Sequence, residues 1–264
     1  MDNVEIGLVQ INNSFSGQPY LPYAVGLLQA YVQRHACDQA RYRFRPPIYT
    51  RMPVHEAVGH LRGVHVAGFS VYVWNVNLSL AIARRLKAAD PSVLIVFGGP
   101  QVPDHPDAFL RAHPFIDVVV HGEGEPAFCT LIEQYPARPD VALLSVSYID
   151  ETDVCITTTR APRMRDLDGA PSPYVGGAFE SLIGAHPEHR WLALWETNRG
   201  CPFECVYCDW GSAIASKVYR FGMERLQQEL EWFAAHQIEF IYCCDANYGI
   251  LPRDLEITQY AADV

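Results

Sequence analysis

Short apolar runs alternate with segments of helical periodicity along the first half of the chain. The runs are apolar at consecutive positions, which predicts strands buried on both faces, and the segments between them repeat apolar residues every three or four positions. The predicted strands are residues 6–11, 42–44, 64–71, 93–97 and 117–120. The predicted helices are residues 23–34, 77–89, 106–112 and 125–135. This alternation predicts an α/β fold, a doubly wound parallel five-stranded sheet of Rossmann-like type with helices on both faces.

The second half of the chain carries a hairpin, a linker and a new β/α rhythm. Two β-prone runs, 144–149 and 154–158, flank a polar turn and predict a β-hairpin, and residues 160–178 have the proline and glycine content of a linker. The pattern then predicts two βα units, with strands at 191–196 and 239–243 and helices at 223–236 and from about 253. The organisation that we expect is a Rossmann-like domain at 1–140, a β-hairpin and linker at 141–190, and a second β/α unit at 191–264.

Composition narrows the class of protein. The 264 residues are 49% hydrophobic, which suits a packed globular chain, and a formal net charge of −10 gives no general attraction to phosphate backbones or anionic lipids. The first residues lack the basic segment and apolar stretch of a secretory signal, and no apolar run approaches the roughly 20 residues of a membrane span. We therefore expect a cytoplasmic protein that binds neither nucleic acid nor a membrane.

Three of the eight cysteines form a cluster. Cys201, Cys205 and Cys208 follow a predicted strand with the spacing CxxxCxxC. A 4Fe–4S cluster or a structural zinc normally takes four protein ligands, so a loop with three thiolates leaves one metal position open for a substrate or cofactor. The alternative is a zinc knuckle completed by a distant histidine such as His189 or His236.

The cysteine loop resembles the radical S-adenosylmethionine (SAM) superfamily, whose defining loop is CxxxCxΦC with an aromatic residue at Φ, here Tyr207. The resemblance implies that Cys201, Cys205 and Cys208 ligate a 4Fe–4S cluster and that Tyr207 lies near the adenine of SAM. The amino and carboxylate groups of SAM would take the fourth iron, and an electron from the cluster would cleave SAM to a 5′-deoxyadenosyl radical. The second β/α unit would then be the first two βα units of a radical SAM barrel, a partial TIM barrel.

A second loop in this unit follows the predicted strand at 239–243. It contains Asp245 and Asn247 and resembles the acidic loop with which radical SAM enzymes hold the amino group of SAM. The alternative is an ordinary βα turn rich in turn-forming residues. Cys243 and Cys244 are adjacent in a strand and point to opposite faces, so we expect packed thiols there rather than ligands.

Glycine-rich loops follow two strands of the first domain. Gly98 and Gly99 come after the fourth predicted strand, and Gly122 and Gly124 after the fifth, so both pairs lie on the carboxyl edge where doubly wound sheets bind ligands. Residues 122–127 also fit the GxGxxA dinucleotide fingerprint. We reject that interpretation, because the fingerprint belongs to the first βα turn and two glutamates here would lie beside a pyrophosphate.

Residues 22–28, 98–100 and 122–125, ahead of a radical SAM loop, together resemble the cobalamin-binding branch of that superfamily over about residues 4–260. The resemblance implies that the corrin ring of cobalamin (vitamin B12) lies across the carboxyl edge of the sheet and faces the cluster. Its candidate contacts are Gly98, Gly99, Gly122 and Gly124, where the alternative is four plain turn glycines.

The loop after the third strand departs from the better known cobalamin proteins, because the motif DxHxxG is absent. Trp74 stands where some cobalamin-dependent radical SAM methylases place a non-coordinating side chain beneath cobalt. An indole there would keep the metal free of a lower ligand. The alternative is that Trp74 packs in the core, with Asn75 or Asn77 as the N-cap of the next helix.

The function that the resemblance implies is a cobalamin-dependent radical SAM methyltransferase of natural-product biosynthesis, possessing a 4Fe–4S cluster, SAM and cobalamin. Methylcobalamin would give its methyl group to a substrate carbon radical, as in the methylation of a carbapenem side chain. The partners implied are a small-molecule substrate and a reducing protein of the flavodoxin or ferredoxin type. One alternative is a cobalamin-binding radical SAM enzyme that catalyses a rearrangement without methylation. Another is a cofactor-binding module or fragment, because only two βα units of the barrel fit between residues 191 and 264.

Overall fold

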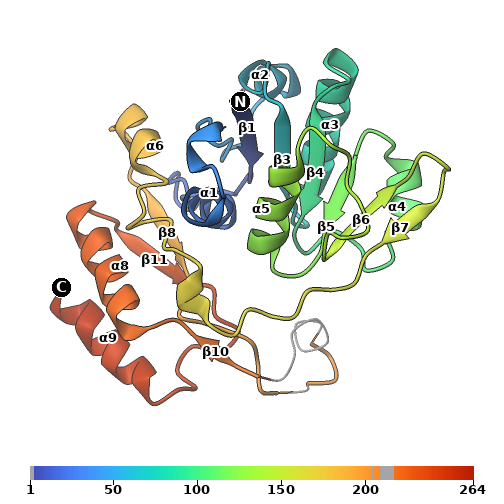
Figure 1. The fold of residues 1–264 in the computed structure, drawn as a ribbon. Coiled ribbons are helices and arrows are strands. Elements are labelled where there is room, and N and C mark those ends of the chain that lie inside the picture. The colour runs from blue at the N-terminus through green and yellow to red at the C-terminus, as the bar shows by residue number, and fades with distance from the viewer. Residues whose placement is uncertain (1–2, 204, 209–216) are drawn as a thin grey trace.

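The computed structural model describes residues 3–203, 205–208 and 217–264, and it contains a large sheet with helices on both faces beside a smaller β/α layer (Figure 1). The large sheet is made of β1 (Val4–Val9), β2 (Tyr42–Phe44), β3 (Val66–Ser70), β4 (Leu94–Gly98), β5 (Val118–Val120), β6 (Val146–Ile149) and β7 (Cys155–Thr157). Its helices are α1 (Tyr23–His35), α2 (Val54–His60), α3 (Val76–Ala89), α4 (Asp107–Ala112) and α5 (Gly124–Gln134).

The large sheet has the strand order β2-β1-β3-β4-β5-β6-β7. Strands β1 to β5 are parallel, which confirms the predicted five-stranded doubly wound core, and the hairpin β6–β7 continues the same sheet in antiparallel pairing. The hairpin joins the sheet because β5 would otherwise present an unpaired edge, and because Val146 of β6 is fully buried in the core beneath α1 and α5. Helices α2, α3 and α4 cover the opposite face.

The smaller layer contains the two predicted βα units. It consists of α6 (Glu180–Ala185), β8 (Leu192–Trp195), β9 (Asn198–Arg199), β10 (Tyr219–Arg220), α8 (Met223–Ala235), β11 (Phe240–Cys243) and α9 (Arg253–Asp263). Strand β8 pairs with β11 in parallel, with Leu192 opposite Phe240 and Trp195 opposite Cys243. The short antiparallel pair β9–β10 and helices α2 and α6 have no counterpart in the sequence analysis.

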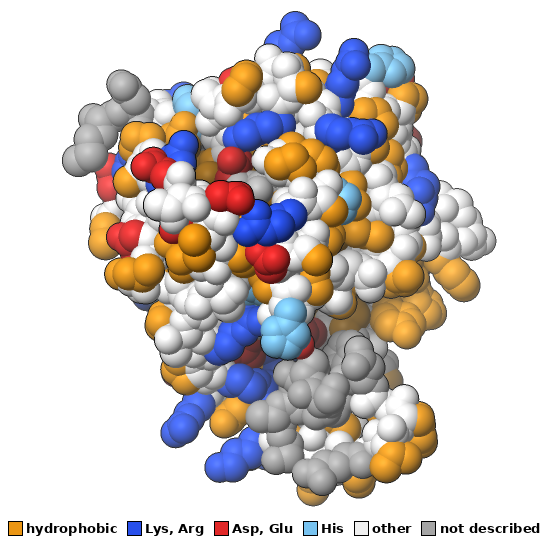
Figure 2. Space-filling view, turned by 90° about the vertical axis from the view of Figure 1, so that its right-hand side faces the viewer, with side chains coloured by type: hydrophobic (Ala, Val, Ile, Leu, Met, Phe, Trp, Pro, Cys, Tyr) orange, Lys and Arg blue, Asp and Glu red, His pale blue; other side chains and the backbone are white. Residues whose placement is uncertain are grey.

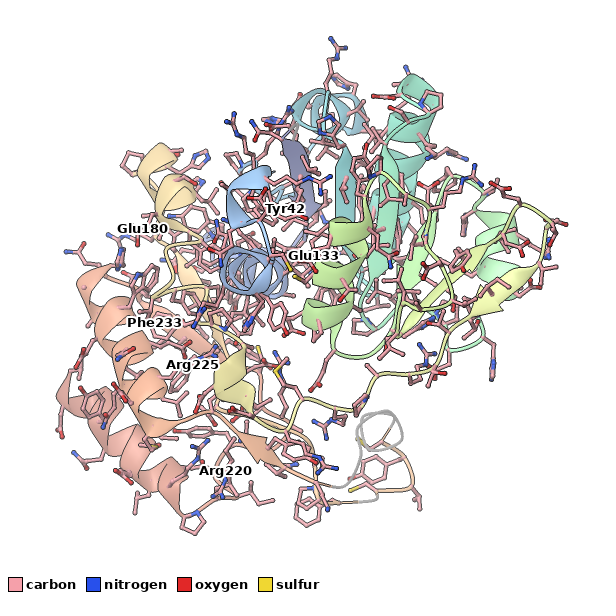
Figure 3. All side chains as sticks on the ribbon, viewed as in Figure 1. Tyr42, Glu133, Glu180, Arg220, Arg225 and Phe233 are labelled. Atoms are coloured by element: carbon pink, nitrogen blue, oxygen red, sulfur yellow. The ribbon has the colours of Figure 1, made fainter. Side chains whose placement is uncertain are left out.

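A third hydrophobic core joins the two layers. Tyr23 of α1, Tyr174 of the predicted linker and Phe233 of α8 are all at most 5% exposed and belong to one cluster, which also contains Phe179. Figure 3 shows Phe233 and Arg225 directed from α8 toward the rest of the molecule. The proline- and glycine-rich segment is therefore packed against both layers, although its composition is typical of a linker.

The described residues contain no helix that is long and apolar enough to cross a membrane. On the described part of the face in Figure 2, basic, acidic and apolar side chains are mixed, and no continuous basic area covers it.

Substituting Gly26 tests the third core. A Cβ atom at Gly26 of α1 would lie 2.3 Å from Cζ of Phe179, so we expect Gly26→Ala to lower the free energy of unfolding by about 1–3 kcal/mol. The matched control is Gly59→Ala in α2, where no atom lies within 4 Å of the new Cβ and the helix propensity of alanine should add up to about 1 kcal/mol. Chemical denaturation measures both variants, and an equal gain in the two would contradict the close contact.

Candidate cofactor site

Trp74 lies in the loop that follows β3, at the carboxyl edge of the large sheet. Its indole is 41% exposed, stacks on the ring of Tyr72 with centroids 4.7 Å apart, and donates Nε1–H to the carbonyl oxygen of Ile11 at 3.2 Å. Asn75 is buried, and its amide donates to the carbonyl oxygens of Ile11 and Ser70. Asn75 occupies the N-cap position of α3 but makes no side-chain capping bond. The indole is thus held at the surface rather than packed in the core.

The four candidate glycines differ in what surrounds them. Gly99 has φ +106°, and a Cβ atom there would lie 2.7 Å from the carbonyl oxygen of Val71, so the turn itself requires glycine. Gly122 has φ +67°, and no atom lies within 4 Å of the Cβ position. Cβ atoms at Gly98 and Gly124 would make ordinary contacts with the protein. Gly122 is therefore the one of the four where open space and a left-handed backbone leave room for a ligand to approach.

The three cysteines of the CxxxCxxC loop lie just after β9. Cys201 is buried, Cys205 is exposed and Cys208 is half-buried, and the backbone N–H of Cys208 donates to the carbonyl oxygen of Cys205 at 3.0 Å. The side-chain amide of Asn247 donates to Sγ of Cys201 at 3.0 Å. Tyr207 is 90% exposed. Three thiols and a hydrogen-bond donor to one sulfur fit an iron–sulfur cluster, whose potential depends on such bonds.

Asp245 lies in the loop that follows β11 and contacts the chain just before the cysteine loop. Its carboxylate accepts hydrogen bonds from the backbone N–H groups of Thr197 and Asn198 at 2.7 and 3.2 Å, from the Asn198 amide at 2.8 Å, and from the Thr197 hydroxyl. Burial raises the pKa of Asp245. The carboxylate thus holds the strand end that precedes Cys201, while Asn247 is the residue of this loop that contacts a cysteine of the CxxxCxxC loop.

Cys243 and Cys244 lie at the end of β11 and just after it, and both are half-buried. Burial raises the pKa of each thiol to about 12. Each thiol therefore holds its proton more tightly than an ordinary thiol, and a metal would have to displace that proton to bind. The expectation of packed thiols at these two positions stays a prediction, because both side chains are only half-buried.

Arg199 connects the glycine-bearing loop after β5 with the cysteine loop after β9. Its guanidinium lies 2.7 Å from Oε1 of Glu125, 3.0 Å from Oε2 of Glu196 and 3.8 Å from Oε1 of Glu123. The side chains of Arg199 and Glu125 are only 12% and 6% exposed. Because Arg199 stands two residues before Cys201 and Glu125 stands next to Gly124, these ion pairs hold the loop after β5 against the start of the cysteine loop. Sequence reasoning missed this link, since no local pattern pairs charges 74 positions apart.

Known proteins match both halves of this site. A family model described as the B12 binding domain matches residues 27–132. The chain is 42% identical over 251 residues to the cobalamin-dependent radical SAM methyltransferase TokK of Streptomyces tokunonensis, and 43% identical over 248 residues to the 2-(S-pantetheinyl)-carbapenam-3-carboxylate methyltransferase of Streptantibioticus cattleyicolor. Over 93% of its length the chain is similar to cobalamin-dependent radical SAM enzymes.

The similarity covers nearly the whole chain but only part of each relative. Each of the two alignments covers 93% of the chain but only 36% of the relative, so the chain spans about a third of the length of these relatives. The fold is also that of the cobalamin-dependent S-adenosylmethionine radical enzyme OxsB, solved with aqua-cobalamin and S-adenosylmethionine bound. The TM-score is 0.77 at 18% identity, over 99% of this chain and 37% of OxsB.

Removing the guanidinium tests the link between the loops. Arg199→Met leaves buried carboxylates of Glu125 and Glu196 without their cation, so we expect the free energy of unfolding near neutral pH to fall by about 3–5 kcal/mol. Arg190→Met is the matched control, because Arg190 pairs with Glu239 at the surface and such pairs contribute about 0–1 kcal/mol. Denaturant titration measures both, and equal losses would show that Arg199 is an ordinary surface cation.

The stability that Arg199→Met loses should increase with pH. Burial raises the pKa of Glu196, while the charge of Arg199 lowers it. A carboxyl with a raised pKa in the folded state contributes stability below the pKa of the unfolded glutamate, and this contribution is lost as the pH rises through the folded-state pKa. Without Arg199 that pKa rises further, so the variant should lose more stability at pH 8 than at pH 5. A loss that is constant over this range would contradict the role assigned to Glu196.

Proposed function

We propose that this chain acts in a cobalamin-dependent radical SAM methyltransferase that transfers a methyl group from methylcobalamin to a substrate carbon. The observation that carries the proposal is the buried link through Arg199, which holds a loop of the B12-binding region against the cysteine loop. A shared reaction needs both cofactors at one place, and this link supplies that proximity. The names of the two relatives support methylation as the outcome.

We further propose that cobalamin lies on the carboxyl edge of the large sheet. Gly122 leaves open space beside a left-handed backbone, and Trp74 presents a half-exposed indole anchored to the carbonyl oxygen of Ile11. The indole would occupy the lower face of the corrin without coordinating cobalt, because its nitrogen is a hydrogen-bond donor only. The fixed backbone at Gly99 keeps the neighbouring turn in place.

The cysteine loop would hold the second cofactor, a 4Fe–4S cluster ligated by Cys201, Cys205 and Cys208. Bound there, the cluster would supply the electron that cleaves SAM, and cobalamin would supply the methyl group. Asn247 would donate its hydrogen bond to the sulfur of Cys201, and Asp245 would fix the strand end before that cysteine. Tyr207 is exposed and free to contact the adenine of SAM.

The substrate that we propose is a small natural-product molecule, in line with the carbapenam named for one relative. The electron would come from a reducing protein of the flavodoxin or ferredoxin type. The mass of the product separates methylation from rearrangement: methylation adds one methylene unit per turnover, and rearrangement adds nothing.

The cluster assignment predicts the behaviour of one cysteine variant. After anaerobic reconstitution the chain should hold about four irons with matching sulfide, and Cys205→Ala should lose them while its circular dichroism stays unchanged. Cys37→Ala is the matched control, since Cys37 is also exposed but lies outside the loop, and it should retain the iron. Zinc in place of iron that is lost in Cys205→Ala, or equal iron in both variants, would refute the assignment.

The position of Trp74 predicts a change in the spectrum of bound cobalt. In Trp74→His an imidazole would replace the indole, so we expect nitrogen superhyperfine splitting in the electron paramagnetic resonance spectrum of bound Co(II) cobalamin. Trp74→Phe keeps an aromatic ring that cannot coordinate, and its spectrum should match that of the unaltered chain. An unchanged spectrum in the histidine variant, with cobalamin still bound, would remove Trp74 from the site.

A further inference from the structure

A second group of metal-ligating side chains lies outside the cofactor site. His186, Glu188 and His189 belong to the turn that connects α6 to β8, and one ligand atom of each lies within 4.8 Å of the others. The turn precedes β8, whereas the cysteine loop follows that strand, so the two groups lie toward opposite ends of β8. The function proposed above makes no use of these side chains.

The three side chains already have the spacing that a small cation requires. Nδ1 of His186 lies 3.3 Å from Oε1 of Glu188, and Nδ1 of His189 lies 3.7 Å from the same oxygen. The two imidazole rings are nearly parallel, with 9° between their planes and centroids 5.0 Å apart. Tetrahedral Zn²⁺ with bonds of about 2.0–2.1 Å separates its ligand atoms by about 3.4 Å, so the ligands need little movement.

Neighbouring aromatic residues hold both imidazoles in place. Nε2 of His189 lies 3.0 Å from the hydroxyl oxygen of Tyr49, and Trp191 packs edge-on against both imidazole rings. Tyr49 and Trp191 belong to the third hydrophobic core. When Nε2 donates its hydrogen to Tyr49, the lone pair on Nδ1 faces Glu188, which is the tautomer that a metal ligand needs.

We propose that His186, Glu188 and His189 bind a divalent cation of the zinc type, with water in the remaining coordination position. Two imidazoles and one carboxylate are a donor set that suits Zn²⁺. Tyr49 belongs to the segment between β2 and α2, beside the large sheet. Through the contact of His189 with Tyr49, the bound ion would therefore hold the α6–β8 turn against the layer of the large sheet. Its role is therefore structural, and it is independent of the cobalamin and cluster chemistry.

Zinc binding is tested on the full 264-residue chain in which Cys201, Cys205 and Cys208 are replaced by serine, so that loop thiolates cannot compete. Isothermal titration with Zn²⁺ should give one ion per chain. Titration with Co²⁺ should give visible d–d bands without the near-ultraviolet charge-transfer band of a cobalt–thiolate bond. Absence of saturable zinc binding, or a thiolate band that accounts for all bound cobalt, would overturn the proposal.

Point variants in the same background locate the ion. His186→Ala and Glu188→Gln each remove one ligand, and we expect the dissociation constant for Zn²⁺ to rise tenfold or more. Tyr49→Phe removes only the hydroxyl that orients His189, and a rise of about 10–100-fold is expected. His55→Ala is the matched control, because His55 faces Glu56 at 4.0 Å as a surface pair without a third ligand. Its zinc affinity should be unchanged.

A thermal shift provides a second measurement that does not depend on calorimetry. A ligand that binds only the folded state raises the melting temperature, so Zn²⁺ should raise it in the parent and in His55→Ala but not in His186→Ala. His186 is partly exposed, so the alanine variant is expected to fold. Equal zinc-induced shifts in His186→Ala and His55→Ala would overturn the assignment of the ion to this turn.

Discussion

The geometry of the cofactor site depends on one buried cation, the guanidinium of Arg199. It lies among three carboxylates, of Glu123, Glu125 and Glu196, that come from a helix start on one layer and a strand end on the other. Removing these groups from water is costly, and a buried pair often gives little net stability compared with apolar packing. Its contribution is instead positional, because carboxylates that accept one planar guanidinium can occupy few relative arrangements.

The third hydrophobic core makes this arrangement possible. Phe179 packs against Gly26 of α1, and Phe233 of α8 lies in the same cluster, so the two layers are joined by apolar contacts as well as by charge. Apolar packing sets how closely the layers approach but tolerates sliding, whereas the directional bonds of Arg199 fix the register between the loops. Apolar packing and the Arg199 ion pairs together therefore place the loop after β5 against the cysteine loop.

The sequence best predicts the elements that are determined by a local pattern of residues. Continuous apolar runs identify the five parallel strands, and the CxxxCxxC spacing identifies the cysteine loop. Helix α6 was missed because it is six residues long and lies beside a proline-rich segment whose burial comes from α1 and α8. The bonds of Asp245 to Thr197 and the pairing of Arg199 with Glu125 join residues 48 and 74 positions apart. Such contacts exist only after the layers meet, so no local pattern reveals them.

The partial burial of Cys243 and Cys244 also affects how an iron–sulfur cluster would be assembled. Cys244 adjoins Asp245, Cys243 precedes Cys244, and Asn247 contacts Cys201, so two additional thiols lie in the segment that contacts the cysteine loop. With a pKa of about 12 each, they offer almost no thiolate at neutral pH to compete for the metal. Ligation of a metal by either thiol would first require removal of a tightly held proton, which disfavours a metal site outside the CxxxCxxC loop.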